Sequence, residues 1–140
     1  MNLFTYGSLM SPDIMEEVSG GQFASYNAVA EGFQRFCVRH EPYPGMVGSS
    51  AGKVEGVVYE GLDSAAMHRL DIFEGEMYVR LPIQVRRTKD NFAMEVMAYI
   101  VKLDYQHMLT QEIWNYEKFL AEGKRIFTEQ YVGFRDIEEE

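Results

Sequence analysis

The sequence predicts an α+β protein in which strands outnumber helices. Alternating apolar and polar residues mark several strands, and separate stretches have the caps and apolar spacing of helices. No internal repeat, low-complexity tract or linker interrupts the 140 residues, which suits one domain spanning residues 1–140. Apolar residues make up 46% of the chain and aromatic residues 14%, so the composition supports a packed core.

The chain opens with an apolar strand at about residues 2–6, followed by a helix at about 12–18. Ser11 is the expected N-cap of this helix. Pro12 falls in its first turn, where a missing N–H costs nothing, and Asp13 suits the same end. The start of the helix is therefore well specified.

The junction between this strand and helix is a candidate anion site. Backbone N–H groups at such a junction can bind a carboxylate or a developing oxyanion, and Gly7 permits close approach of the backbone. An ordinary strand-to-helix turn would explain the same spacing. The candidate substrate-binding residues here are Tyr6, Gly7, Ser8, Leu9, Met10 and Ser11.

Strands are expected within about residues 22–39 and at about 53–60, followed by a short helix at about 63–71. Asp63 can cap this helix. The apolar side of the helix is expected to consist of Leu62, Met67, Leu70 and Phe73. Loops around residues 40–52 and after residue 103 are the segments whose shape the sequence predicts least well.

Glu74 follows the last apolar residue of this helix and precedes Gly75, which ends it. The negative end of a helix and neighbouring apolar residues both disfavour ionisation, so Glu74 is a candidate general base. A solvated acidic residue at a helix end is the ordinary alternative. Glu76 would take the place of Glu74 if the register of the turn differed by a small shift.

The second half of the chain predicts a hairpin and a helix. Strands at about 78–88 and 92–102 flank a turn at residues 89–91, and their side chains alternate in character. A helix at about 111–129 is expected, with Trp114 on its packed side. The acidic residues at the end of the chain suit a solvated tail.

Two motifs in this order resemble the γ-glutamylcyclotransferase-like superfamily, and in particular its short-chain branch related to plant avirulence-induced proteins. The first motif is Phe4-Thr5-Tyr6-Gly7-Ser8-Leu9. The second is Leu70-Asp71-Ile72-Phe73-Glu74-Gly75 followed by Tyr78-Val79-Arg80. The resemblance covers residues 1 to about 105 well and the helical segment from about 105 loosely.

This resemblance implies a small mixed β-barrel flanked by helices, with the first motif and Glu74 at one mouth. It also implies an enzyme that cyclises a γ-glutamyl group to 5-oxoproline and releases an amine or amino acid. Glu74 would be the catalytic residue, and Tyr78 would orient the substrate through its hydroxyl. No cofactor or metal is expected.

Several neighbouring residues have two interpretations. Tyr78 could simply cover the mouth of the barrel. Arg80 could bind a substrate carboxylate, although an ion pair with Glu74 or Glu76 is the better expectation. Tyr43-Pro44-Gly45 fits either a pocket wall or a simple turn. Tyr99 and Tyr131 are further aromatic candidates without a positional argument.

Composition excludes several other classes of function. The formal net charge of −9 argues against nucleic acid or an anionic membrane as a partner. Cys37 is the only cysteine, so no intramolecular disulfide can form, and the three histidines lack the spacing of a metal site. No stretch approaches a membrane span or a secretory signal, so a cytoplasmic location is expected. The sequence predicts no oligomeric state.

Three functional hypotheses remain open. The first is an enzyme that releases 5-oxoproline from a γ-glutamyl amine, dipeptide or ε-(γ-glutamyl)lysine-like remnant. The second is a related enzyme acting on a γ-glutamyl-protected metabolite. The third is a non-catalytic module that binds or senses a γ-glutamyl metabolite. The combination of Glu74 with the first motif favours an enzyme, because a binding module needs no unpaired carboxylate beside an anion site.

Overall fold

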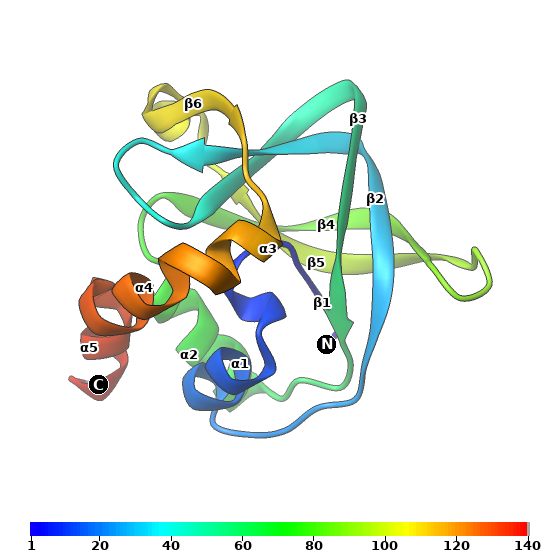
Figure 1. The fold of residues 1–140 in the computed structure, drawn as a ribbon. Coiled ribbons are helices and arrows are strands. Elements are labelled where there is room, and N and C mark those ends of the chain that lie inside the picture. The colour runs from blue at the N-terminus through cyan, green and yellow to red at the C-terminus, as the bar shows by residue number, and fades with distance from the viewer. Residues whose placement is uncertain (140) are drawn as a thin grey trace.

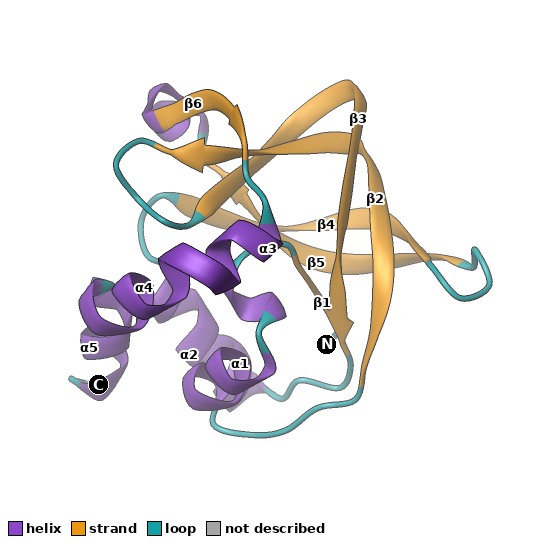
Figure 2. Cartoon of the chain, viewed as in Figure 1, coloured by secondary structure: helices purple, strands orange, loops and turns teal. Residues whose placement is uncertain are grey.

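Five strands form a closed barrel, and the helices gather on one side of it (Figures 1 and 2). A computed structural model describes residues 1–139. The strands are β1 (Leu3–Thr5), β2 (Ser25–Val38), β3 (Pro44–Tyr59), β4 (Tyr78–Arg87), β5 (Ala93–Val101) and β6 (Leu109–Ile113). The helices are α1 (Pro12–Ser19), α2 (Ser64–Glu74), α3 (Tyr116–Lys118), α4 (Lys124–Gln130) and α5 (Val132–Glu138), with 3-10 turns at Ser8–Met10 and Leu103–Met108 and a π-helical turn at Phe119–Gly123.

The strand order explains how the barrel closes. Neighbouring strands follow the order β3-β1-β5-β4-β2, and β2 then pairs with β3 to complete the ring. β1 runs parallel to β5, whereas the other neighbours in the ring are antiparallel. The small mixed barrel implied by the resemblance is therefore confirmed.

β2 and β3 form one long, bent hairpin. Their register shifts between Glu31 and Phe33, which indicates a bulge, and bulges bend and twist strands. At the bend, a Cβ on Gly52 would lie 2.2 Å from the carbonyl oxygen of Phe33, so only glycine fits. The expectation of loops around residues 40–52 is wrong for most of that range, because β3 already begins at Pro44.

Alternation along the strands produces two apolar layers. Phe4 and Val58 belong to the buried cluster that fills the barrel. Their neighbours Leu3 and Tyr59 belong to a second cluster, which the residues of α1 and α2 share. Successive residues in a strand point to opposite faces, so one face of β1 and β3 fills the barrel and the other packs against the helices.

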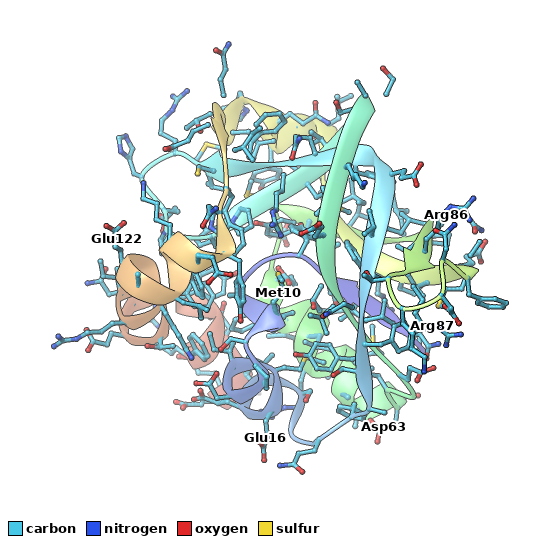
Figure 3. The ribbon with its side chains drawn as sticks, turned by 45° about the vertical axis from the view of Figure 1, so that its right-hand side comes forward. Met10, Glu16, Asp63, Arg86, Arg87 and Glu122 are labelled. Atoms are coloured by element: carbon cyan, nitrogen blue, oxygen red, sulfur yellow. The ribbon has the colours of Figure 1, made fainter. Side chains whose placement is uncertain are left out.

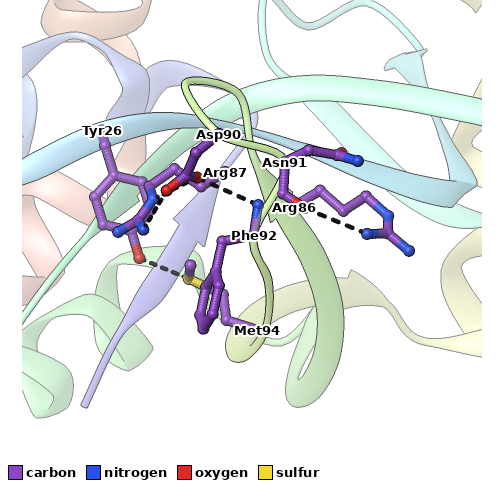
Figure 4. Close-up of polar contacts among 7 residues, drawn as sticks. All are labelled: Tyr26, Arg86, Arg87, Asp90, Asn91, Phe92 and Met94. Carbon is purple, nitrogen blue, oxygen red and sulfur yellow. Dashed lines mark hydrogen bonds and ion pairs between the residues drawn. The ribbon is translucent and has the colours of Figure 1, made fainter.

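The β4–β5 hairpin turns around residues 89–91, as expected. Asn91 has a φ of 59°, a conformation that Asn tolerates in tight turns. The guanidinium of Arg87 donates to the carboxylate of Asp90 at 2.7 Å and braces the turn (Figure 4). Arg87 lies on the opposite side of the molecule from Glu122 of the C-terminal helices (Figure 3).

The helix expected at 111–129 is wrong in its first part. Leu109–Ile113 forms β6, which pairs with the end of β2 and so satisfies its backbone there. The helix begins only at Tyr116, after the Asn115 side chain accepts the backbone N–H of Lys118 at 2.8 Å. Trp114 precedes the helix and is nevertheless buried, with only 4% of its surface exposed.

Candidate active site

The loop after β1 forms one side of the candidate site. β1 ends at Thr5, whose hydroxyl donates to the carbonyl oxygen of Val57 on β3 at 2.7 Å. The 3-10 turn begins at Ser8, and the first N–H groups of such a turn have no acceptor within it. The loop therefore presents backbone donors next to the barrel.

Side chains from several strands hold this loop in place. The Tyr59 hydroxyl donates to the carbonyl oxygen of Leu9 at 2.9 Å, and the Arg35 guanidinium donates to that of Tyr6 at 2.6 Å. A Cβ on Gly7 would lie 2.9 Å from the Pro44 ring, so this glycine accommodates a neighbouring side chain. The closely approaching group is thus a proline of β3.

α2 positions Glu74 on the opposite side. The Asp63 carboxylate accepts the N–H of Ala66 at 2.8 Å and caps the start of the helix, as expected. Glu74 is the last residue of α2, and Gly75 follows with a φ of 79° that favours glycine. This turn redirects the chain, and Glu76 is exposed to solvent.

Burial raises the pKa of the Glu74 carboxyl group from 4.5 to about 8, and the charge of Asp71 contributes to the same shift. Burial favours the neutral acid because the carboxylate loses its hydration, and a nearby negative charge acts in the same direction. The raised pKa expected for this position is therefore confirmed. A carboxyl group with such a pKa can accept and return a proton near neutral pH.

A narrow pocket lies between the loop and Glu74, with a cavity volume of about 30 Å³. Residues from the barrel, α2 and the C-terminal helices contribute to its surface. The lining consists of residues 4–9 together with Tyr43, Pro44, Phe73, Glu74, Tyr78, Tyr99, Phe127 and Tyr131.

Five tyrosines surround Glu74. Burial raises the pKa of each hydroxyl, in Tyr43 to about 12, and the negative charge of Glu74 adds to the shift in every case. The five hydroxyls therefore lie within electrostatic reach of the carboxyl group. They are those of Tyr6, Tyr43, Tyr78, Tyr99 and Tyr131.

Four of these hydroxyls donate their protons to other protein groups. Tyr6 donates to the carbonyl oxygen of Tyr99 at 2.6 Å, and Tyr78 to that of Pro44 at 2.7 Å. Tyr99 donates to the Asp71 carboxylate at 2.7 Å, and Tyr131 donates to the carbonyl oxygen of Phe73 at the same distance. The oxygens of these tyrosines can also accept hydrogen bonds, and the Tyr6 oxygen already has one from the Met46 backbone.

Asp71 lies one helical turn before Glu74 and links α2 to the barrel. Besides accepting the Tyr99 hydroxyl, its carboxylate lies 3.4 Å from the Arg80 guanidinium. Arg80 therefore pairs with Asp71, which corrects the expected partners Glu74 and Glu76. The reason is geometric: Asp71 faces the β4–β5 surface, whereas Glu74 turns into the pocket.

Two of the expected substrate-binding residues lie outside the pocket lining. Met10 lies in the turn before α1 (Figure 3), and its sulfur accepts a hydrogen bond from the Arg35 guanidinium at 3.6 Å. Ser11 is buried, and its hydroxyl donates to the Asp13 carboxylate. Both residues belong to the structural support of the loop, because the chain has turned away from the cavity after Leu9.

Residues 1–139 contain neither a cluster of metal ligands nor a membrane-spanning helix. No three His, Cys, Asp or Glu side chains lie close enough together there to hold a metal ion. None of the helices in the same range has the length and apolar content to span a lipid bilayer.

Residues 3–118 match the family described as "Gamma-glutamyl cyclotransferase, AIG2-like". The chain belongs to this family. AIG2-like protein A of Arabidopsis thaliana is 33% identical over 132 residues, which cover 93% of this chain and 78% of the relative.

Solved structures support the family's fold for this chain. A solution structure from Arabidopsis thaliana superposes with a TM-score of 0.72 at 28% identity, covering 99% of this chain and 81% of the other. A protein titled "Gamma-glutamyl cyclotransferase" superposes with a TM-score of 0.64 at 18% identity, covering 72% of this chain and 66% of the other. The second likeness concerns the fold alone.

Within this AIG2-like family member, the pocket combines residues that the sequence indicated with residues that it did not. Tyr43 and Pro44 form a pocket wall, one of their two expected interpretations, and Tyr78 lies in the same lining. Phe127 carried no signal of a site in the sequence. Its side chain reaches the pocket because α4 packs beside α2, and helical spacing alone would assign it to the core.

Proposed function

We propose that this chain is a cyclotransferase that converts the γ-glutamyl group of a small molecule to 5-oxoproline and releases an amine. The observation that carries the proposal is the Glu74 carboxyl group, with a pKa of about 8, across a pocket from the loop that follows β1. Membership in the γ-glutamyl cyclotransferase family supports it.

Cyclisation forms one bond and breaks another within the same substrate. The α-amino nitrogen attacks the γ-carbonyl carbon, the bond from that carbon to the leaving nitrogen breaks, and a proton moves between the two nitrogens. Glu74 takes the proton from the attacking amine and returns it to the leaving amine. Such proton transfer contributes roughly 10²–10⁴-fold to the rate.

The loop and the tyrosines fit the two charged groups on the α-carbon of a γ-glutamyl substrate, its carboxylate and its ammonium group. Backbone N–H groups of Gly7, Ser8 and Leu9 bind the carboxylate or the developing oxyanion. The oxygens of Tyr6 and Tyr78 accept hydrogen bonds from the ammonium group, since their own protons are already donated. Holding the amine against the γ-carbonyl supplies up to roughly 7–11 kcal/mol of barrier reduction.

Release of 5-oxoproline from a panel of γ-glutamyl amines and dipeptides tests this function. We expect Glu74→Gln to reduce the rate of 5-oxoproline release by at least about 10²-fold, since glutamine cannot carry the proton. Glu76→Gln is the matched control, because Glu76 is exposed two residues away, and it should retain full activity.

Full activity in Glu74→Gln would contradict the mechanism. If no compound releases 5-oxoproline while the protein is folded, the enzyme hypothesis gives way to a module that binds a γ-glutamyl metabolite.

A further inference from the structure

One wall of the pocket is aromatic and comes largely from the C-terminal segment, residues 119–139, which lies beyond the family match. Phe127 of α4 and Tyr131, at the break between α4 and α5, stack with their ring centroids 4.7 Å apart. Tyr43 contacts both rings edge-on, at 5.9 Å and 5.2 Å. We refer to Tyr43, Phe127 and Tyr131 as the aromatic wall.

The aromatic wall is attached directly to the turn that carries Glu74. The Tyr131 hydroxyl donates to the carbonyl oxygen of Phe73 at 2.7 Å and lies 3.2 Å from that of Glu74. A Cβ on Gly133 would lie 2.4 Å from the same Phe73 oxygen, so glycine lets α5 touch the end of α2. The C-terminal segment therefore fits against α2 without space between them.

The charges around the aromatic wall are negative. Among residues 1–139, the pocket lining contains no Lys, Arg or His, and Glu74 is its only carboxyl group. Burial raises the pKa of the Tyr131 hydroxyl most, and the charges of Glu74, Tyr43, Asp136 and Glu41 raise it further, so negative charge predominates around this hydroxyl. A substrate carboxylate here would meet negative charge without a cation to pair with.

Aromatic faces attract cations and apolar groups instead. A cation over such a face gains about 0.5–2 kcal/mol, depending on how far it is desolvated. The loop on the other side of the pocket holds the γ-glutamyl end in the proposed function, so the leaving amine faces the wall. The cavity of about 30 Å³ is small, and the wall side chains must shift to admit a substrate.

Resting on the proposed function, we propose that the aromatic wall is the subsite for the leaving amine. It selects amines whose free end is apolar or cationic over amines whose free end is a carboxylate. Phe127 and Tyr131 are then specificity-determining residues contributed by the segment beyond the family match.

Three γ-glutamyl compounds of equal chain length test the subsite: those of pentylamine, putrescine and γ-aminobutyrate. We expect kcat/KM for the pentylamine and putrescine compounds to exceed kcat/KM for the γ-aminobutyrate compound, whose free end is a carboxylate, at least about tenfold. This factor corresponds to about 1.4 kcal/mol. Comparable values for all three would overturn the proposal.

Two variants locate the selectivity. Phe127→Leu should reduce the ratio of kcat/KM for the pentylamine and putrescine compounds to kcat/KM for the γ-aminobutyrate compound by about three- to tenfold. The reason is that an aliphatic side chain lacks the aromatic face. Phe134→Leu is its control, since Phe134 packs on Phe73 and Phe127 but does not line the pocket, and it should keep the ratio. An equal change in both variants would indicate general loosening and contradict the proposal.

Glu41→Lys provides a test that does not depend on the core. Glu41 is exposed, so the substitution leaves the fold intact and adds a cation beside the wall. We expect faster turnover of the γ-aminobutyrate compound and slower turnover of the putrescine compound. No change in their ratio would count against the subsite.

Failure of the subsite differs from failure of the proposed function. If no compound yields 5-oxoproline, calorimetric binding of the same three compounds decides the matter. Tighter binding of the amines, weakened by Phe127→Leu, would support the subsite without cyclisation. Equal binding of all three, or none, would overturn it.

Discussion

Two glutamates only two positions apart have different environments. Glu74 ends α2 and lies in the pocket lining, whereas Glu76 is exposed after the turn at Gly75. The two side chains are chemically identical, and only Glu74 is buried, which together with the Asp71 charge raises its pKa. The backbone conformation of Gly75 thus decides which of the two carboxyl groups lies in the pocket.

Asp71→Asn should lower the pKa of Glu74, because it removes the negative charge that helps to raise it. Burial remains, so the pKa should stay above the ordinary value of 4.5. We expect the acidic limb of the pH profile of kcat/KM to move to lower pH. The same shift should appear when Glu74 is titrated by NMR.

Asp63→Asn is the control for this experiment. It changes the same residue type at the other end of α2, where asparagine also caps a helix well. An unchanged profile in Asp71→Asn, or an equal shift in the control, would count against a direct effect of Asp71.

Glu74 should also make stability depend on pH. Its folded pKa of about 8 lies above the ordinary 4.5, so the folded protein binds one more proton than the unfolded chain between these values. The free energy of unfolding should therefore fall as pH rises through this window, by up to about 1.4 kcal/mol per pH unit. Glu74→Gln should flatten this slope in urea denaturation, and an identical slope in both proteins would contradict the pKa.

Local signals in the sequence placed Glu74 beside the end of a helix, as the structure has it, whereas contacts between distant segments were less predictable. Glu74 could be found because a helix end, apolar neighbours and Gly75 adjoin it in the sequence. The predicted ion-pair partner of Arg80 was wrong, because Asp71 and β4 meet only in the folded chain. The hydrogen bond from Tyr131 to Phe73 joins segments whose sequences give no sign of each other.

At the scale of elements, the predicted boundaries of helices and strands were right where local signals set them and wrong where a distant strand did. α2 and the β4–β5 hairpin have their caps and turns within the segment, and their expected ranges agree closely with the structure. The first part of the helix expected at 111–129 is instead β6, because pairing with β2 satisfies this backbone in an extended form. Tertiary pairing therefore overrode a helical pattern.

The contact between α5 and α2 should depend on the absence of a side chain at Gly133. In Gly133→Ala, the new Cβ would lie 2.4 Å from the Phe73 carbonyl oxygen and 2.3 Å from the Tyr131 ring. We expect a loss of about 1–3 kcal/mol in the free energy of unfolding, measured by urea denaturation.

Gly48→Ala is the matched control, because within residues 1–139 no atom beyond Gly48 and its two chain neighbours lies within 4 Å of the Cβ position there. It should change stability by no more than about 0.5 kcal/mol. Equal effects of the two substitutions would show that close packing of α5 on α2 is unimportant.

At the scale of the whole molecule, barrel closure could not be read from periodicity. Alternation shows that a strand has two faces, but it does not identify the strand's neighbours. Here β1 lies between β3 and β5, and a Cβ on Gly56 would come within 2.2 Å of the Thr5 carbonyl oxygen. The closed form was expected only from the family resemblance.

Arg35 connects three parts of the molecule and should be sensitive to replacement. Its guanidinium donates to the carbonyl oxygens of Tyr6 and Glu55 at 2.6 and 3.0 Å and lies 5.0 Å from the Trp114 ring centroid. Arg35→Lys should cost roughly 1–3 kcal/mol of stability, because an ammonium cannot reproduce the planar fork.

Chemical denaturation measures this cost, and Arg39→Lys serves as the control because Arg39 is exposed. A change in Arg35→Lys as small as in the control would mean that these contacts do not bind the site loop to the barrel.

The short strand β1 has a consequence for the time course of folding. All three of its residues pair with β3 and Leu3 also pairs with β5, so the barrel closes through contacts between segments far apart in the chain. Folds rich in such contacts form slowly, because distant segments must meet before any bond rewards them. During synthesis, the pocket can be completed only after residue 131 has left the ribosome, long after the loop at residues 6–9 has emerged.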